Sequence, residues 1–350
     1  MASEADEILR LFDVGGHADA VLCTLVELVG SGYRRPGARL LITRDASGNV
    51  RRAGMISGGC LEKDLCRRAF DLARGGATVV AYDTREEAPV PAGFDSGCEG
   101  VTHVFIEPAT AEAIGHPRLG IADALIYHGR DFGRRYIAED APPQLAQALR
   151  RAADLDAAQP VVLEDGTRAL IDPHHPPRRL AIFGDGDDVA ALVTIAEAAG
   201  FDVIVCGRSP TTAERYPSAR IGDLADLAGS LRLGRRDAAV LLTHGLKEDA
   251  SALPVLLASP CFYVGLLGPR KRAGRLMRDL HAAGRLPDAS QLDRLHSPAG
   301  LDLGGDGPRA VALSVVAEIE AAANARDGSP LRDRPGRIHV ERSVREEQLV

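Results

Sequence analysis

Residues 57–62 (Ser-Gly-Gly-Cys-Leu-Glu) place a thiol beside two glycines, at the point where an apolar strand-like run gives way to a helix-like run. Paired glycines let the backbone turn sharply and approach a ligand closely. Cys60 falls at or near the first helical position, where unpaired backbone N–H groups carry partial positive charge, attract anions and favour a thiolate. The stretch therefore predicts a ligand site built from Ser57, Gly58, Gly59, Cys60 and Glu62, although Glu62 could simply complement the helix dipole.

A second cysteine, Cys98, lies in a similar glycine-flanked turn over residues 96–100. The chain has six cysteines and no C-x-x-C pair, so the sequence carries no zinc signature and a reducing compartment would keep them as thiols. Cysteines usually pack as small apolar side chains, and we expect that of the other four. A glycine-rich loop at residues 30–37 adds Arg34 and Arg35, which either meet a phosphate or belong to a solvated turn.

The composition limits the classes of function. A chain of 350 residues with 45% hydrophobic side chains is long enough for two globular domains, and small aliphatic residues must fill their cores because aromatics make up only 4%. The formal net charge of −7 argues against a nucleic-acid partner. The acidic N-terminus does not resemble a signal peptide and no apolar run is long enough to cross a membrane, so we expect a cytoplasmic protein without membrane contacts.

Strand-like runs predominate in the first part of the chain, which predicts an α+β N-terminal domain over residues 1–112. Strands are expected over residues 20–28, 39–43, 50–56, 78–82 and 101–107, and helices over 1–17 and 60–74.

Residues 113–177 are expected to connect two domains, with a hairpin that turns through Asp165-Gly166. The run 172–177 (Asp-Pro-His-His-Pro-Pro) predicts an irregular boundary. His174 and His175 point apart as neighbours, so solvation in a linker explains them more simply than metal binding.

From Arg178 the pattern changes to alternating strands and helices. A strand over 180–183, a glycine-containing turn, a helix from Val189 and a strand over 203–206 form a βαβ unit typical of Rossmann folds. Further strands are expected at 219–221, 238–242 and 261–264, and helices at 248–258, 270–283 and 308–323. The pattern predicts an α/β Rossmann-like C-terminal domain with a mostly parallel sheet over residues 178–325, followed by a mobile tail at 326–350.

Ligands bind such sheets at the carboxyl ends of the strands. The candidate binding residues there are Gly184, Gly186, Arg208, Thr243, His244, Gly265, Gly268 and Arg270. A dinucleotide is the first expectation, and Arg208 would favour the 2′-phosphate of NADP. Three aspartates within residues 185–188 oppose it, because carboxylates repel a pyrophosphate unless they are screened or turned outward. The basic run 270–272 is as consistent with a solvated helix start as with an anion site.

Motifs along most of residues 15–320 resemble those of the XdhC/CoxI family, accessory factors for xanthine dehydrogenase and related molybdenum hydroxylases. The similar segments are residues 30–39, 57–62, 98–100, 176–186, 243–244, 263–268, 300–304 and 312–319. The resemblance implies a chaperone rather than an enzyme with a turnover of its own. Such a protein binds the molybdenum cofactor, protects it during sulfuration and delivers it to the apo-enzyme.

The resemblance also implies roles for particular residues. Arg34 and Arg35 would meet the phosphate of the molybdopterin, while Cys60 or Cys98 would contact the metal or relay sulfur. The implied partners are the apo-form of a molybdenum hydroxylase, a cysteine desulfurase and, by analogy with the family, a second copy of the chain. The sequence departs from the family pattern at Asp185, where alanine is common, so the first-domain site is better supported than a nucleotide site in the second.

Two other functions remain open. An NADP-dependent oxidoreductase would use the Rossmann-like domain, with His244 near the chemistry, and calorimetric binding of NADP would distinguish it from a chaperone. A thiol-based redox sensor would act through Cys60, and an unreactive thiol there would count against it.

Overall fold

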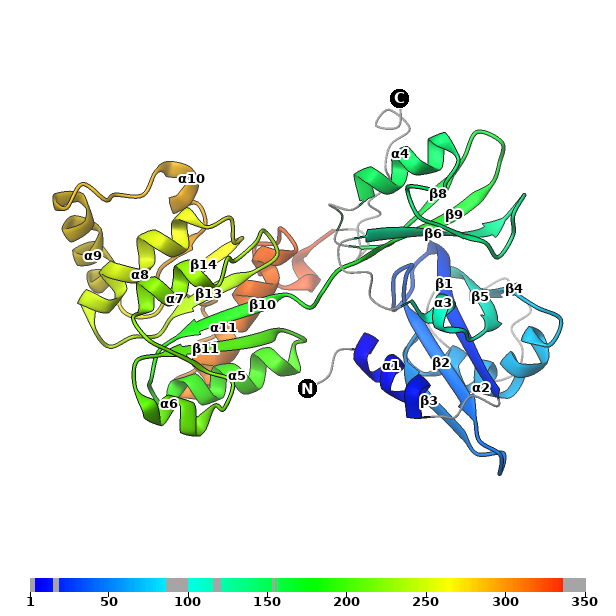
Figure 1. The fold of residues 1–350 in the computed structure, drawn as a ribbon, viewed down its shortest axis with the longest axis horizontal. Helices are drawn as coiled ribbons and strands as arrows, with labels where there is room; N and C mark the ends of the chain where they lie inside the picture. Colours follow the sequence, from blue (N-terminus) through cyan, green and yellow to red (C-terminus); the bar gives the residue numbers. More distant parts are fainter. Residues whose placement is uncertain are drawn as a thin grey trace. The chain divides into compact units, whose positions relative to one another are not determined.

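The computed structural model describes residues 4–14, 19–85, 100–115, 121–152, 155 and 157–335. The chain divides into two compact units, one ending at Pro176 and the other beginning at Pro177 (Figure 1). Cys98 and residues 336–350 of the expected tail lie outside the described ranges.

The first unit is built on a five-stranded antiparallel sheet in the order β3-β2-β1-β5-β4. Its strands are β1 (Asp19–Gly30), β2 (Arg39–Arg44), β3 (Val50–Gly54), β4 (Thr78–Asp83) and β5 (Gly100–Pro108). Side chains alternate between its faces. Cys23 and Leu25 of β1 pack with helix α2 (Cys60–Ala73), whereas Leu22 and Val26 belong to the cores on the opposite face.

That opposite face is covered by helices α1 (Glu4–Val14) and α3 (Ala111–Ile114) and by a second antiparallel sheet, ordered β7-β6-β9-β8. Its strands are β6 (Ile121–His128), β7 (Arg135–Tyr136), β8 (Gln159–Val162) and β9 (Arg168–His174), and helix α4 (Pro143–Ala152) packs on its far side. Phe105 of the first sheet and Leu170 of the second share one buried cluster. Residues 121–174 therefore complete the core of the first unit.

The hairpin expected through Asp165-Gly166 is confirmed, because β8 pairs with β9 in antiparallel register. The irregular structure expected over residues 172–177 is wrong for its first half, since β9 continues through Pro173 to His174. The described pairing of β8 with β9 ends at Ile171, so the N–H that proline lacks is not needed on that side.

The two histidines of this run have partners within the chain. His174 Nε2 lies 3.1 Å from a carboxylate oxygen of Asp123, and His175 Nε2 lies 2.6 Å from the carbonyl oxygen of Leu155. The interpretation of both residues as part of a solvated linker is therefore wrong.

The second unit carries a six-stranded parallel sheet in the order β12-β11-β10-β13-β14-β15. The strands are β10 (Arg179–Phe183), β11 (Asp202–Gly207), β12 (Arg220–Ile221), β13 (Ala238–Leu241), β14 (Tyr263–Leu266) and β15 (Leu295–His296). This is the strand order 3-2-1-4-5-6 of a Rossmann fold, with its topological switch point between β10 and β13. The predicted fold class is confirmed for both parts of the chain.

Helices cover both faces of this parallel sheet (Figure 1). One core contains α5 (Asp188–Ala198) and α11 (Pro308–Ala323), and the other contains α7 (Leu224–Ser230), α8 (Leu246–Ala258) and α9 (Arg270–Ala282). Short helices α6 (Pro210–Arg215), α10 (Ala289–Leu292) and η1 (Leu331–Asp333) complete the unit. Across the described ranges, no helix has the length and apolar character needed to span a bilayer.

Candidate functional site

One buried carboxylate holds the loop ahead of α2. Oε1 of Glu62 accepts hydrogen bonds from the backbone N–H groups of Ile56 (2.9 Å) and Ser57 (2.6 Å). Its Oε2 accepts from the Ser57 hydroxyl (2.5 Å) and from the N–H of Gly59 (3.0 Å), while that hydroxyl accepts from the N–H of Leu61 (3.0 Å). Glu62 therefore acts as a clamp that fixes the loop, a larger part than complementing the helix dipole.

The clamp presents residues 57–60, here called the glycine–cysteine loop, on the surface. Cys60 is an exposed free cysteine at the first position of α2. A Cβ placed on Gly59 would have no heavy atom within 4 Å, so the space beside it is open. A Cβ on Gly58 would lie 3.9 Å from the ring of Tyr33, which is itself 61% exposed. A thiol, open backbone and an aromatic ring thus lie together on one surface.

The loop between β1 and β2 (residues 31–38) joins this surface to the start of β5. Besides Tyr33 it contains Ser31, whose carbonyl oxygen would be 2.3 Å from a Cβ on Gly100. Only glycine fits at that point, two residues after Cys98. Gly58 and Gly100 therefore both lie against this loop.

The two arginines of this loop differ in their surroundings. Arg34 donates to both carboxylate oxygens of Glu4 in α1, at 2.6 and 3.1 Å, so the guanidinium expected to meet a phosphate already has a charged partner. The side chain of Arg35 is exposed.

The two glycines of the glycine–cysteine loop are expected to respond differently to substitution by alanine. Gly59 has φ +117°, a backbone conformation that is strained for any residue with a side chain. Gly59→Ala should therefore lower the free energy of unfolding by about 1–3 kcal/mol. Gly58 has no positive φ and room for a methyl group, so Gly58→Ala should leave stability unchanged or raise it by up to ~1 kcal/mol. Urea denaturation of both variants measures the difference, and equal stabilities would contradict it.

At the switch point of the Rossmann-like sheet, three of the predicted residues come together. A Cβ on Gly186 would lie 3.1 Å from Nε2 of His244, and one on Gly184 would lie 2.9 Å from the carbonyl oxygen of Leu242. The turn after β10 and the loop after β13 are thus in close contact, and the exposed imidazole of His244 lies beside the first turn.

The neighbouring turn after β11 is occupied by a carboxylate of the chain itself. Asp185 accepts from the N–H groups of Arg208 (3.1 Å) and Ser209 (3.3 Å), and from the hydroxyl of Thr212. The guanidinium of Arg208, expected to favour a 2′-phosphate, lies 2.6 Å from Glu248. The donors that a nucleotide could use at this turn are therefore engaged within the chain.

A buried ion pair organises the end of β13. Asp249 is fully buried and accepts from Nη2 (2.5 Å) and Nε (3.1 Å) of Arg272, and also from the hydroxyl of Thr243 (2.5 Å). Arg272 also donates to the carbonyl oxygens of Thr243 (2.9 Å) and His244 (3.2 Å), and a Cβ on Gly268 would meet its side chain at 2.8 Å. Thr243 and Gly268, predicted as ligand residues, thus pack around this arginine.

The remaining two predicted residues of the second unit have different surroundings. Arg270 is exposed at the start of α9. Gly265 is buried in β14, where a Cβ would come within 2.8 Å of the Tyr263 ring. Arg272 is turned inward, so the basic run 270–272 combines an exposed side chain with a structural one.

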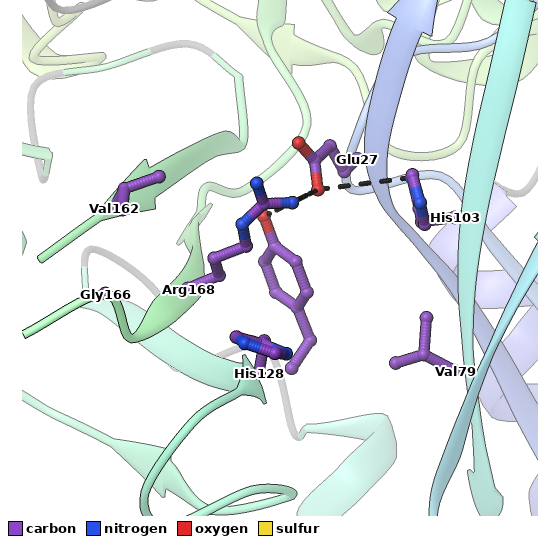
Figure 2. Close-up of a pocket in the computed structure, with 8 residues that line it drawn as sticks. Glu27, Val79, His103, His128, Val162, Gly166 and Arg168 are labelled. Atoms are coloured by element: carbon purple, nitrogen blue, oxygen red, sulfur yellow. Dashed lines mark hydrogen bonds and ion pairs between the residues drawn. The ribbon is translucent and has the colours of Figure 1, made fainter.

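The sequence interpretation missed a pocket between the two sheets of the first unit (Figure 2). It is lined by Glu27 on β1, His103 on β5 and Arg168 on β9, among others. The available signal was a charged residue near the end of the apolar strand run 20–28, but nothing in the sequence indicated that residue 168 would face it. Among the described residues, no cluster of three or more His, Cys, Asp or Glu side chains is arranged to hold a metal ion.

Comparisons with known proteins find a matching family model for each of the two units. The model of the XdhC and CoxI family matches residues 15–83, and that of the XdhC Rossmann domain matches residues 180–319. A Bacillus subtilis protein, described as a probable subunit of xanthine dehydrogenase, is 31% identical over 322 residues, which is 86% of this chain and 92% of the relative.

Two further relatives extend the similarity. The Escherichia coli molybdenum cofactor insertion chaperone PaoD is 26% identical over 313 residues, covering 86% of this chain and 82% of its own. A crystal structure from Bacillus halodurans, described as a xanthine dehydrogenase, has a TM-score of 0.72 at 26% identity and covers 96% of this chain and 98% of that one. With both units matched and one relative similar over nearly its whole length, the chain belongs to the XdhC and CoxI family.

Proposed function

We propose that this protein is a molybdenum cofactor chaperone, which protects the cofactor during sulfuration and delivers it to a xanthine dehydrogenase-type hydroxylase. Family membership supports this function, and so does the similarity to PaoD, a molybdenum cofactor insertion chaperone. The observation that carries the proposal is the exposed Cys60, held by the Glu62 clamp next to open backbone at Gly59.

The residues of this surface fit such a cofactor. Cys60 would contact the metal or relay sulfur, because it is exposed and cysteine sulfur is a soft ligand. The open backbone at Gly58 and Gly59 would admit the flat pterin, with the Tyr33 ring beside it. The cofactor itself supplies a dithiolene-bound molybdenum centre for the client's redox chemistry, and the chaperone needs no turnover of its own.

The proposed partners follow from this role. The apo-form of the client hydroxylase would receive the cofactor, and a cysteine desulfurase would supply the sulfur. We also propose that the chaperone acts in the cytoplasm as a homodimer, with Cys98 and Arg35 as further ligand residues.

Retention of the cofactor tests the proposal. The purified protein is incubated with molybdenum cofactor, free ligand is removed by gel filtration, and the retained pterin is quantified by fluorescence after oxidation. We expect near-stoichiometric retention by the wild type and by Cys66→Ser, and loss of retention in a Cys60→Ser/Cys98→Ser double variant. Cys66 is a matched control because it lies half-buried on the same helix. Full retention by the double variant would show that neither thiol is needed to hold the cofactor.

The same protein titrated with NADP in a calorimeter separates the chaperone from the oxidoreductase alternative. We expect no heat of binding, since Asp185 engages the N–H groups of Arg208 and Ser209 and would repel a phosphate there. Tight NADP binding together with no cofactor retention would reject the chaperone and favour the oxidoreductase.

A further inference from the structure

The pocket between the two sheets of the first unit has a volume of about 520 Å³, within the range of small-molecule sites. Figure 2 shows that its polar side chains converge from both sheets, Glu27 and His103 from one and Arg168 from the other. Val79 and Val162 line it on opposite sides, and Tyr127 also belongs to its lining. The pocket therefore combines apolar walls with a polar centre.

The polar centre is an ion pair that uses only part of each charged group. Oε2 of Glu27 accepts from Nη1 of Arg168 at 2.8 Å and from the Tyr127 hydroxyl at 3.4 Å. Within the part of the chain that the structure describes, Oε1 of Glu27 and the Nε and Nη2 groups of Arg168 have no partner. A free acceptor and free donors thus stand next to each other in the cavity.

His103 adds a second polar group, which has an unused hydrogen-bonding atom. Its Nδ1 lies 4.0 Å from Oε2 of Glu27, beyond hydrogen-bonding distance, and is buried without a hydrogen-bond partner among the described residues. Burying a polar atom without a partner has a free-energy cost that a bound ligand can relieve. His128 lines the same cavity.

The charges decide which ligands fit. Glu27 and Arg168 neutralise one another, so the pocket favours a neutral ligand over an anion or a cation. A carboxylate oxygen beside a guanidinium N–H complements a ligand edge that carries an N–H donor next to a carbonyl acceptor. The valine and tyrosine walls suit a flat ring.

We propose that this pocket binds a neutral planar heterocycle with a lactam edge, as pterins and 6-oxopurines have. Glu27 accepts from the ring N–H, and Arg168 donates to the adjacent carbonyl. This assignment does not rest on the proposed function, since it concerns a different set of residues from the glycine–cysteine loop.

Calorimetric titration of the full-length protein with pterin, hypoxanthine and quinoxaline tests the assignment. Quinoxaline is a flat bicyclic ring with two acceptor nitrogens and no N–H donor, so we expect it to bind at least tenfold more weakly than the better lactam. Binding of both lactams supports recognition of the shared edge, and binding of one alone identifies its source as a pterin or a purine. No saturable heat from either lactam up to about 1 mM would overturn the proposal.

Matched variants locate the site. Glu27→Gln replaces the charged acceptor, and we expect it to weaken binding about ten- to a hundredfold. Glu107→Gln is the control, because Glu107 also bridges the two sheets, to Arg135 at 2.6 and 2.9 Å, yet does not line the pocket. Its affinity should match that of the wild type.

A second variant keeps the test valid if Glu27→Gln loosens the unit. Val162 is 60% exposed on β8, so Val162→Trp should fold and should fill the cavity while leaving the ion pair intact. Loss of binding in Val162→Trp supports the pocket. Unchanged binding in both Val162→Trp and Glu27→Gln would place the heterocycle elsewhere and refute the assignment.

Discussion

Replacing Arg272 with methionine is expected to lower the free energy of unfolding by about 3–5 kcal/mol. The guanidinium is the charged partner of Asp249, whose carboxylate is fully buried, and methionine would leave that charge uncompensated. The same change removes the hydrogen bonds that fix the carbonyl oxygens of Thr243 and His244. Urea denaturation followed by circular dichroism measures the loss.

Two companion variants make this test specific. Arg270→Met alters an exposed arginine at the start of the same helix and should change stability by no more than about 0.5 kcal/mol. The double variant Arg272→Met/Asp249→Leu removes both charges and should recover much of the lost stability, because an apolar pair replaces the unpaired carboxylate. A double variant less stable than Arg272→Met would contradict this account.

Glu62→Gln is expected to lower the free energy of unfolding by about 2–3 kcal/mol, because an amide NH₂ cannot accept the hydrogen bonds that one carboxylate oxygen now receives. The change leaves the buried N–H of Ile56 and the half-buried N–H of Ser57, or the half-buried N–H of Gly59, without an acceptor. Glu112→Gln, at an exposed first-turn position of α3, is the control and should have little effect. Wild-type stability for Glu62→Gln would show that the clamp is not needed.

The effect of Glu62→Gln should depend on pH. Burial by itself would raise the pKa of Glu62, but hydrogen bonds from Ser57 and from backbone N–H groups outweigh it and hold the pKa below its ordinary value of 4.5. A depressed folded-state pKa means that the stabilisation is fully present above 4.5 and is lost as the pH falls through the folded-state value. Denaturation curves at pH 7 and at pH values below 4.5 should therefore show the wild type and the variant converging in acid.

The positions of helices and strands could largely be predicted from the sequence, because they depend on local patterns. The helix expected from residue 60 begins at Cys60, and the helix expected over 270–283 is observed as Arg270–Ala282. Glycine pairs, caps and the spacing of apolar residues operate over a few positions, so they can be read from the sequence. The prediction for residues 172–177 was wrong for its first half because it used local pattern alone, in which a proline indicates the end of a strand. In the described part of the structure, one side of β9 is unpaired at Pro173 and tolerates the proline.

The partners of the charged side chains could not be predicted in this way. Arg34 pairs with Glu4 and Arg272 with Asp249, and Arg39 lies 2.7 Å from Asp172, which is 133 positions away in the sequence. Each pair depends on which elements pack together and on which way a side chain points, and neither follows from periodicity. The same limit explains why the pocket around Glu27 went unnoticed.

The second sheet of the first unit determines where this chain can be recombined with its relatives. Residues 121–174 cover one face of the first sheet, so a chimera joined near residue 112 would separate Phe105 from Leu170 and exchange half of a shared core. Only residues 175–178 separate β9 from β10, and the boundary between the two compact units falls between Pro176 and Pro177 in the chain. A crossover there keeps each hydrophobic core whole, so that whole units can be exchanged between members of the family.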